Sequence, residues 1–76
     1  MTQEHMTPAQ RAAQANTYAE TAHYMRQNAK ETRDSQLPFG HADADVVNAA
    51  LEQVARQYDN LAVYFDGKAQ GMRQEL

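Results

Sequence analysis

The stretch VVNAALEQVARQYDNLAVYF, residues 46–65, decides the fold of this chain. Its large apolar residues recur at alternating steps of four and three, which is the spacing of one face of an α-helix. Numbered as a heptad, these residues take positions a and d, and Ala55 and Ala62 take the adjacent position e. The a/d residues are Val47, Leu51, Val54, Tyr58, Leu61 and Phe65. Such a face has to be covered by the same chain, by a second copy, or by another protein.

A second helix is predicted upstream, from Pro8 to about Arg33, because this segment contains no internal glycine or proline. Thr7 and Gln10 have the spacing of a capping box, and Pro8 suits the first helical position. The apolar face of this helix is mostly alanine, which allows helix axes to approach closely. Its a, d and e residues are Ala12, Ala15, Tyr18, Ala19, Ala22, Met25 and Ala29.

A turn is predicted between the helices, over about residues 34–42. Pro38 disfavours helical dihedral angles at Leu37, and Gly40 permits a sharp turn. Leu37 and Phe39 are apolar residues in this otherwise polar segment. We favour the interpretation that they form a plug at the end of a helical bundle. The alternative is an exposed recognition tip.

The second helix is predicted to run from about residue 43 to Asp66, with Asp43 or Asp45 as its N-cap. Gly67 is the expected C-cap. Residues 68–76 are expected to form a frayed helix or a tail, and residues 1–6 to be disordered. The predicted domain is therefore a helical hairpin over residues 7–67.

The expected fold class is all-α, an antiparallel hairpin of two long helices that pairs into a dimeric four-helix bundle. A short connection joins antiparallel neighbours, and the a/d/e stripes are wider than a two-helix contact requires. A chain of 76 residues without cysteine has few means of stabilisation other than oligomerisation. The predicted self-association seam comprises Ala15, Tyr18, Ala22, Met25, Val47, Leu51, Val54, Tyr58, Leu61 and Phe65.

The charge pattern disfavours nucleic acid as a partner without removing it as an alternative. The net charge is −3 and the sequence pI is about 5.4, whereas nucleic-acid-binding domains carry a basic patch. Arg26, Lys30 and Arg33 form a short basic strip, but acidic residues lie close by in the sequence. A nucleic-acid-binding hairpin dimer is therefore the second hypothesis.

A metal-binding bundle is a third, weaker hypothesis. Glu20 and His23 have the Glu-x-x-His spacing of carboxylate-bridged metal sites in helical bundles. The heptad register, however, places them at f and b, on the solvent side of the helix. No nucleophile elbow or phosphate-binding loop is present. We therefore expect no catalytic, metal or cofactor site, and no enzyme activity.

Two tyrosines lie off the seam and are predicted to be exposed, Tyr24 at c and Tyr64 at g. With Leu37 and Phe39 they are the candidate contacts for an unidentified protein partner, because aromatic residues are favoured anchors at interfaces. No apolar run is long enough to span a membrane, and no signal peptide is evident. The sequence thus predicts a cytoplasmic, non-enzymatic protein-binding module, such as a regulator, an inhibitor or an assembly factor.

Overall fold

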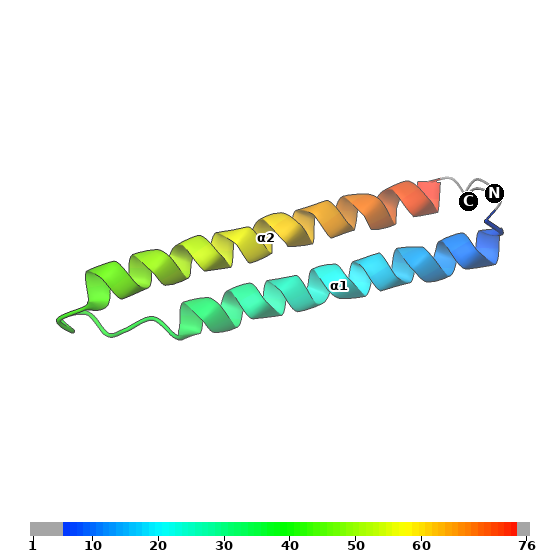
Figure 1. The fold of residues 1–76 in the computed structure, drawn as a ribbon. Coiled ribbons are helices and arrows are strands. Elements are labelled where there is room, and N and C mark those ends of the chain that lie inside the picture. Colours follow the sequence, from blue (N-terminus) through cyan, green and yellow to red (C-terminus); the bar gives the residue numbers. More distant parts are fainter. Residues whose placement is uncertain (1–5, 75–76) are drawn as a thin grey trace.

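The computed structural model describes residues 6–74 and contains two antiparallel helices (Figure 1). They are α1 (Pro8–Asp34) and α2 (Ala44–Gln74), joined by residues 35–43. The molecule is long and thin, with principal dimensions of 57 × 17 × 17 Å. The predicted hairpin of two long helices is confirmed, and no strand occurs within residues 6–74. The predicted disorder concerns residues that, apart from Met6, lie outside the described part of the chain.

The N-terminus of α1 has the predicted capping box. The Gln10 amide donates to Thr7 Oγ1 at 3.1 Å, and the Thr7 amide donates to Gln10 Oε1 at 2.9 Å. Pro8 occupies the first turn, where its missing N–H leaves no hydrogen bond unmade. At the other end the Ser35 amide donates to the Glu31 carbonyl. The helix therefore begins where the sequence predicts and ends at Asp34.

The second helix starts immediately after Asp43. The Asp43 carbonyl accepts a hydrogen bond from the Val47 amide at 3.0 Å, so Asp43 stands at the N-cap position. Asp45 lies in the first turn of α2. Negative charge at both positions stabilises the helix N-terminus.

The predicted end of the second helix at Asp66 is wrong. The helix continues through Gly67 as far as Gln74, and residues 75–76 lie outside the described residues. Ala69, beyond the glycine, is only 2% exposed. A glycine inside a helix costs about 1 kcal/mol, and the continued packing of α2 on α1 offsets this cost.

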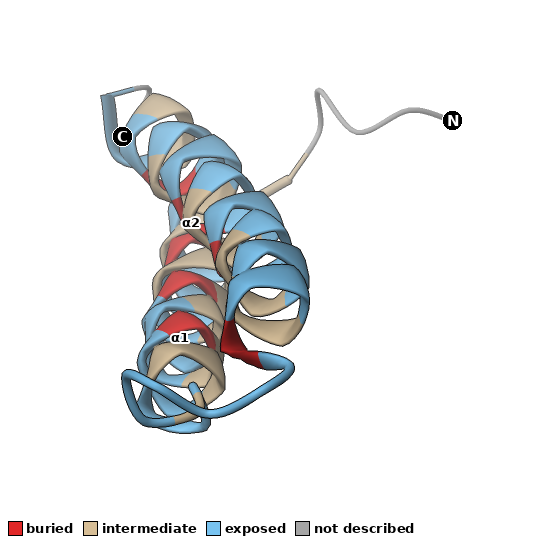
Figure 2. Ribbon diagram, turned by 90° about the vertical axis from the view of Figure 1, so that its left-hand side faces the viewer, coloured by how far each residue is buried: buried red, intermediate tan, exposed pale blue. Residues whose placement is uncertain are grey.

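Within residues 6–74 all buried residues are alanines, and they form the line of buried positions between the helices in Figure 2. Within each helix the buried alanines recur mainly at every seventh residue, so they face one another along the hairpin. No large side chain is fully buried within residues 6–74. The buried residues are Ala15, Ala22, Ala29, Ala44, Ala55, Ala62 and Ala69.

The contact of α2 with α1 is centred on heptad position e and not on the a/d stripe of residues 46–65. Ala55 and Ala62 are buried, whereas Val54 is 42% and Leu61 44% exposed. Small side chains lie on the line of closest approach because they let the axes come together. The large residues are displaced to one side, so the chain covers only part of its most apolar face.

Candidate functional site

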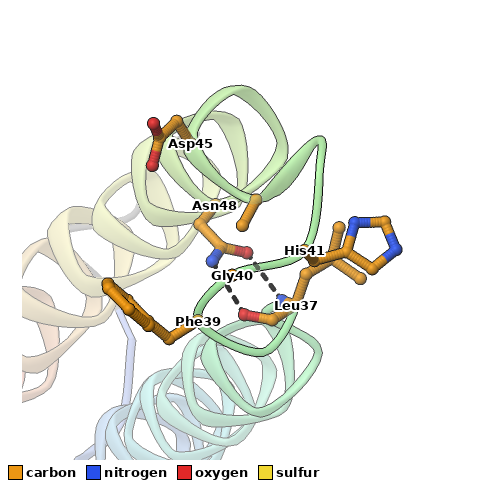
Figure 3. A pocket seen from close by; sticks show the side chains of 7 residues that line it. Leu37, Phe39, Gly40, His41, Asp45 and Asn48 are labelled. Carbon is orange, nitrogen blue, oxygen red and sulfur yellow. Dashed lines mark hydrogen bonds between the residues drawn. The ribbon is translucent and has the colours of Figure 1, made fainter.

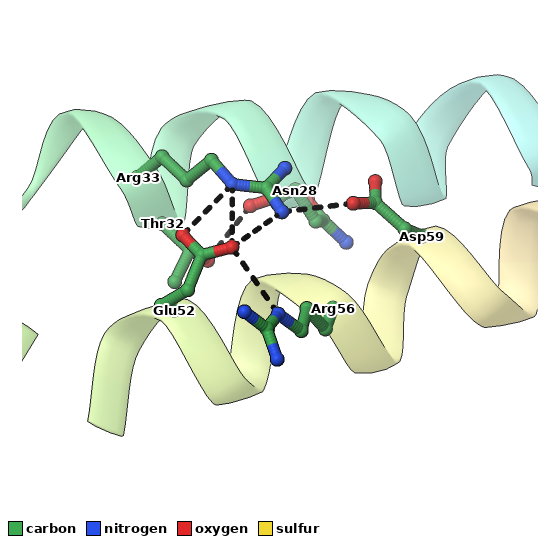
Figure 4. Close-up of polar contacts among 6 residues, drawn as sticks. All are labelled: Asn28, Thr32, Arg33, Glu52, Arg56 and Asp59. Atoms are coloured by element: carbon green, nitrogen blue, oxygen red, sulfur yellow. Dashed lines mark hydrogen bonds and ion pairs between the residues drawn. The ribbon is translucent and has the colours of Figure 1, made fainter. Parts of the chain in front are cut away.

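One long side of the hairpin, on the flank of the alanine contact, carries ion pairs between the helices. Arg33 Nε donates to Glu52 Oε1 at 3.1 Å, and Arg33 Nη2 donates to Glu52 Oε2 and to Asp59 Oδ2, both at 2.9 Å (Figure 4). Two turns earlier along the same flank of α1, Arg26 pairs with Asp66. We call this side the charged edge, made up of Arg26, Arg33, Glu52, Asp59 and Asp66. Its charges are paired within one chain.

Two members of the charged edge, Glu52 and Arg33, have shifted pKa values. Hydrogen bonds from Arg33, and then its positive charge, hold the pKa of the Glu52 carboxyl below its usual value. Hydrogen bonds to Glu52 and Asp59 raise the pKa of the Arg33 guanidinium. Arg56 also approaches Glu52, with Nε and Oε2 3.6 Å apart. The Glu52 carboxyl and the Arg33 guanidinium are therefore ionised at neutral pH.

The predicted basic strip is neutralised by carboxylates of the same chain. Arg26 and Arg33 belong to the charged edge, and Lys30 Nζ donates to Asp34 Oδ2 at 2.9 Å. The Asp34 carboxylate raises the pKa of the Lys30 ammonium by hydrogen bonding and charge. Nucleic-acid binding depends on lysine and arginine side chains that neutralise phosphates and release the counterions of the nucleic acid. Because these cations are paired with carboxylates of the same chain, the nucleic-acid hypothesis is weakened.

The pairing across the charged edge was not recognised in the sequence, although a signal for it exists. Asp45, Glu52, Asp59 and Asp66 follow one another at intervals of seven, as the buried alanines do. A column of acidic residues beside a column of alanines indicates an interhelical ion-pair ladder. Arg26 and Arg33 have the same spacing on the other helix.

The opposite side of the hairpin carries the large residues of the predicted seam, and we call it the apolar edge. Tyr18 of α1 and Phe65 of α2 stack there, with ring centroids 6.1 Å apart and planes 22° apart. The register places the other members along the same side. The members are Tyr18, Met25, Val47, Leu51, Val54, Tyr58, Leu61 and Phe65, each partly or largely exposed. The remaining seam residues, Ala15 and Ala22, are buried between the chain's own helices.

At the tip of the hairpin, Asn48 fixes the turn to α2. Its Nδ2 donates to the Leu37 carbonyl at 3.0 Å, and its Oδ1 accepts from the Leu37 amide at 2.7 Å (Figure 3). Asn48 precedes Ala55 by seven residues, so it continues the alanine column and ends it with a polar group. Both backbone hydrogen-bonding groups of Leu37 are thereby satisfied. The sequence analysis did not single out Asn48.

The same turn displays Phe39. The His41 amide donates to the Pro38 carbonyl at 3.1 Å, and Gly40 has φ +95°. These are the features of a type II turn, whose third position favours glycine. Phe39 in the second position is fully exposed. The predicted plug is therefore wrong for Phe39, while Leu37 is half-buried.

Phe39 borders a shallow concavity of about 410 Å³ at the tip. Figure 3 shows Phe39 and Asp45 on one side of the tip, with Leu37 and His41 on the other. Ala44 and Asn48 complete the lining. The tip therefore presents an aromatic ring and a carboxylate around one shallow concavity, on a turn that hydrogen bonds hold in place.

The two tyrosines predicted to be exposed are exposed. Tyr24 has 57% and Tyr64 has 55% of its surface accessible. Tyr64 lies edge-on to Phe65, with centroids 5.2 Å apart, and Lys68 Nζ is 5.6 Å from its ring centroid. Tyr64 therefore forms an outer rim of the apolar edge.

Glu20 and His23 both lie on the exposed surface of α1, as their heptad positions predict. Within residues 6–74 no cluster of three or more histidine, aspartate or glutamate side chains is suited to hold a metal ion. Neither helix of this region has an apolar stretch sufficient to cross a membrane. The large surfaces left to consider are the apolar edge and the tip.

Comparisons with models of protein families, with curated protein sequences and with solved structures found no match. Functional argument therefore proceeds from the residues and contacts of this chain.

Proposed function

We propose that this chain is a non-enzymatic helical hairpin that self-associates through its apolar edge and acts by binding another protein. Two copies would form a dimeric four-helix arrangement with Tyr58 and Leu61 near its centre. One observation carries the proposal: within residues 6–74 every buried residue is alanine, while the large side chains of the apolar edge lie partly or largely exposed along one side. A regulator, an inhibitor or an assembly factor acts in this way.

The energy balance of a small hairpin supports self-association. Full burial of a large apolar side chain is worth about 1.5–3 kcal/mol, and a core this small supplies roughly 3–5 kcal/mol or less in total. A partner that covers Val54, Leu61 and their neighbours adds an amount comparable to the whole stability of the hairpin. Folding and association are then coupled.

Sedimentation equilibrium at micromolar concentration tests this proposal. We expect the mass of a dimer, and a thermal midpoint that rises with protein concentration, because dissociation accompanies unfolding. A well-folded monomer whose midpoint is independent of concentration would overturn the self-association.

The tip supports the second part of the proposal, the binding of another protein. An exposed aromatic side chain on a turn held by hydrogen bonds loses little conformational freedom when it binds, and aromatic residues dominate interface energetics. Phe39 is such a residue, and its removal leaves the helix contacts untouched.

Affinity capture from the native host, with nuclease treatment, compares the wild type with Phe39→Ser. We expect proteins that are retained by the wild type and lost by the variant, at equal helicity and mass of the two baits. Retention of nucleic acid that survives in high salt, or equal capture by both baits, contradicts a protein-binding role of the tip.

A further inference from the structure

We infer that the second copy binds with its α2 antiparallel to the first α2, so that Lys68 of each copy pairs with Asp43 of the other. This inference rests on the proposed self-association and specifies its geometry. The two turns then lie at opposite ends of the dimer, and a twofold axis crosses α2 between Val54 and Tyr58.

The side chains on the outer flank of each helix indicate that α2 of one copy packs against α2 of the other. On α2 a column at intervals of seven, Val47, Val54 and Leu61, flanks the half-buried members of the apolar edge. On α1 the corresponding column, beside Tyr18 and Met25, is polar. It consists of Gln14, Thr21 and Asn28. Packing α2 against α1 of a second copy would bury apolar groups against amides and a hydroxyl, whereas packing α2 against α2 matches apolar groups with each other.

Charges at the two ends of this column select the antiparallel orientation. Lys68 follows Leu61 by seven residues and ends the apolar column, and Asp43 lies immediately before the helix that carries Val47. Both end residues are exposed. A parallel pair would place lysine beside lysine and aspartate beside aspartate. The antiparallel pair brings opposite charges together at both ends, and it also opposes the helix dipoles.

The position of the axis follows from these two end contacts. Facing residues lie at equal distances from the axis, so Val47, four residues after Asp43, faces Tyr64, four residues before Lys68. Tyr64, exposed on the rim of the isolated hairpin, is then covered by the second copy. The apolar column between the two charged residues is buried along its whole length.

The ion pairs of the charged edge determine where α1 lies in this dimer. Arg33, at the end of α1, pairs with Glu52 and Asp59, which stand on either side of the axis. Each α1 therefore crosses the level of the axis before it ends at Asp34 and leads into its turn. All four helices meet near the axis, while both charged edges face away from the α2–α2 contact.

A charge swap tests the orientation. Lys68→Glu places a carboxylate opposite Asp43, and Asp43→Lys places an ammonium opposite Lys68. Each variant alone should dimerise roughly tenfold more weakly than the wild type, since two exposed pairs change from attraction to repulsion. An equimolar mixture of the two variants should restore the wild-type dissociation constant to within about threefold, because both pairs are then attractive.

The matched control replaces Asp45, an acidic residue of the charged-edge flank. The heterodimer of Lys68→Glu with Asp45→Lys keeps one attractive and one repulsive end contact, so it should form less tightly than the heterodimer of Lys68→Glu with Asp43→Lys. Equal restoration by both mixtures, or restoration by neither, overturns the antiparallel pairing. A monomeric wild type instead overturns the self-association on which the pairing rests, so the two failures are distinguishable.

Disulfide trapping supplies a second measurement, independent of charge, because the chain contains no cysteine. We expect an interchain disulfide when Val47→Cys and Tyr64→Cys are mixed under mild oxidation, and none when either variant is oxidised alone. Disulfides require Cα atoms about 4.4–6.8 Å apart, whereas like positions lie far apart in the antiparallel pair. Dimers of Val47→Cys alone indicate a parallel pair. The absence of any disulfide in the mixture, with the wild type dimeric, also overturns the inference.

Discussion

The charged edge and the apolar edge flank the same line of alanines, yet only the charged edge has its groups paired within the chain. On the charged edge, Arg33 contacts Glu52 and Asp59, and Arg26 contacts Asp66. On the apolar edge, the ring contact of Tyr18 with Phe65 leaves the neighbouring Leu61 44% exposed. Polar groups can be satisfied by water as well as by each other, whereas apolar groups gain only when water is removed.

The difference indicates separate roles for the two edges. Alanine surfaces are smooth, so the alanine contact alone would allow α1 to slide along α2. The placement of Arg33 between Glu52 and Asp59 opposes such a shift, because moving one turn would break the bidentate contact. The charged edge therefore sets the register of the hairpin, and the apolar edge offers the surface for association.

The largest expected effect comes from placing a charge on the apolar edge. Leu61→Asp should give an unfolded or monomeric chain, because the carboxylate would be buried without a partner in the dimer. The matched control is Val63→Asp, on the opposite flank of α2, where Val63 is 67% exposed. Sedimentation and circular dichroism of both variants make the test. Equal loss of association in both would contradict the assignment of the apolar edge.

Enlarging a buried alanine should have the next largest effect. Ala22 is fully buried between the helices, so Ala22→Leu should separate them and lower the free energy of unfolding by about 1–3 kcal/mol. Ala13→Leu, on the exposed face of α1, should leave stability almost unchanged. Urea denaturation of both variants provides the comparison. A stabilised Ala22→Leu would show that the edges, and not the alanines, hold the helices together.

Removing the Asn48 side chain tests whether its hydrogen bonds to Leu37 hold the turn against α2. Asn48→Ala leaves the amide and carbonyl of Leu37 without their partners, and it should cost about 1–2 kcal/mol. Hydrogen exchange should show lost protection at the Leu37 amide, with the helix amides little changed. The exposed Asn60 supplies the control variant, Asn60→Ala. Unchanged exchange at Leu37 would mean that Asn48 does not fix the turn.

Acid should weaken the charged edge by a small amount. The pKa of the Glu52 carboxyl lies below its ordinary value of 4.5 in the folded chain, so ionised Glu52 stabilises the fold. This contribution is present above pH 4.5 and is lost as the pH falls through the lower, folded-state pKa. Glu52→Gln should reduce the loss of stability in acid, whereas Glu20→Gln, on the exposed outer face, should not. Denaturation curves between neutral pH and about pH 2 measure this difference.

Local chemistry made much of the hairpin predictable from the sequence. The capping box of Thr7 and Gln10 and the turn around Pro38 and Gly40 depend on neighbouring residues, and the structure confirms them. The exposure of Tyr24 follows from helical periodicity alone. Such features need no knowledge of how the helices pack together.

Features that depend on how the two helices pack against each other, or on the geometry of the turn, were harder to predict. Periodicity placed Ala55 and Ala62 at heptad position e, but it centred the seam on the large a and d residues, whereas α1 contacts the alanines. The glycine signal at Gly67 was overridden because Ala69 still packs on α1. The exposed position of Phe39 depends on the geometry of the turn.

In the candidate site, too, features of a single helix were predicted, whereas contacts between distant residues were missed. The residues of the apolar edge were recognised because their periodicity is a property of one helix. The pairing of Arg33 with Glu52 and the contact of Asn48 with Leu37 were missed because each joins residues far apart in the sequence. Glu52 belongs to the acidic column at intervals of seven, and Asn48 continues the alanine column. These columns indicate contacts only once the helices are known to be antiparallel.

The all-alanine contact has a calorimetric consequence. The heat capacity of unfolding arises mainly from newly hydrated apolar surface, about 0.45 cal/mol/K per Å², and each buried alanine contributes little more than one methyl group. Separating α1 from α2 should therefore add little to the heat capacity change. Any large heat capacity change of unfolding would have to come from the apolar edge. Calorimetry at several protein concentrations would therefore show how much of this change comes from apolar surface that is buried between two copies.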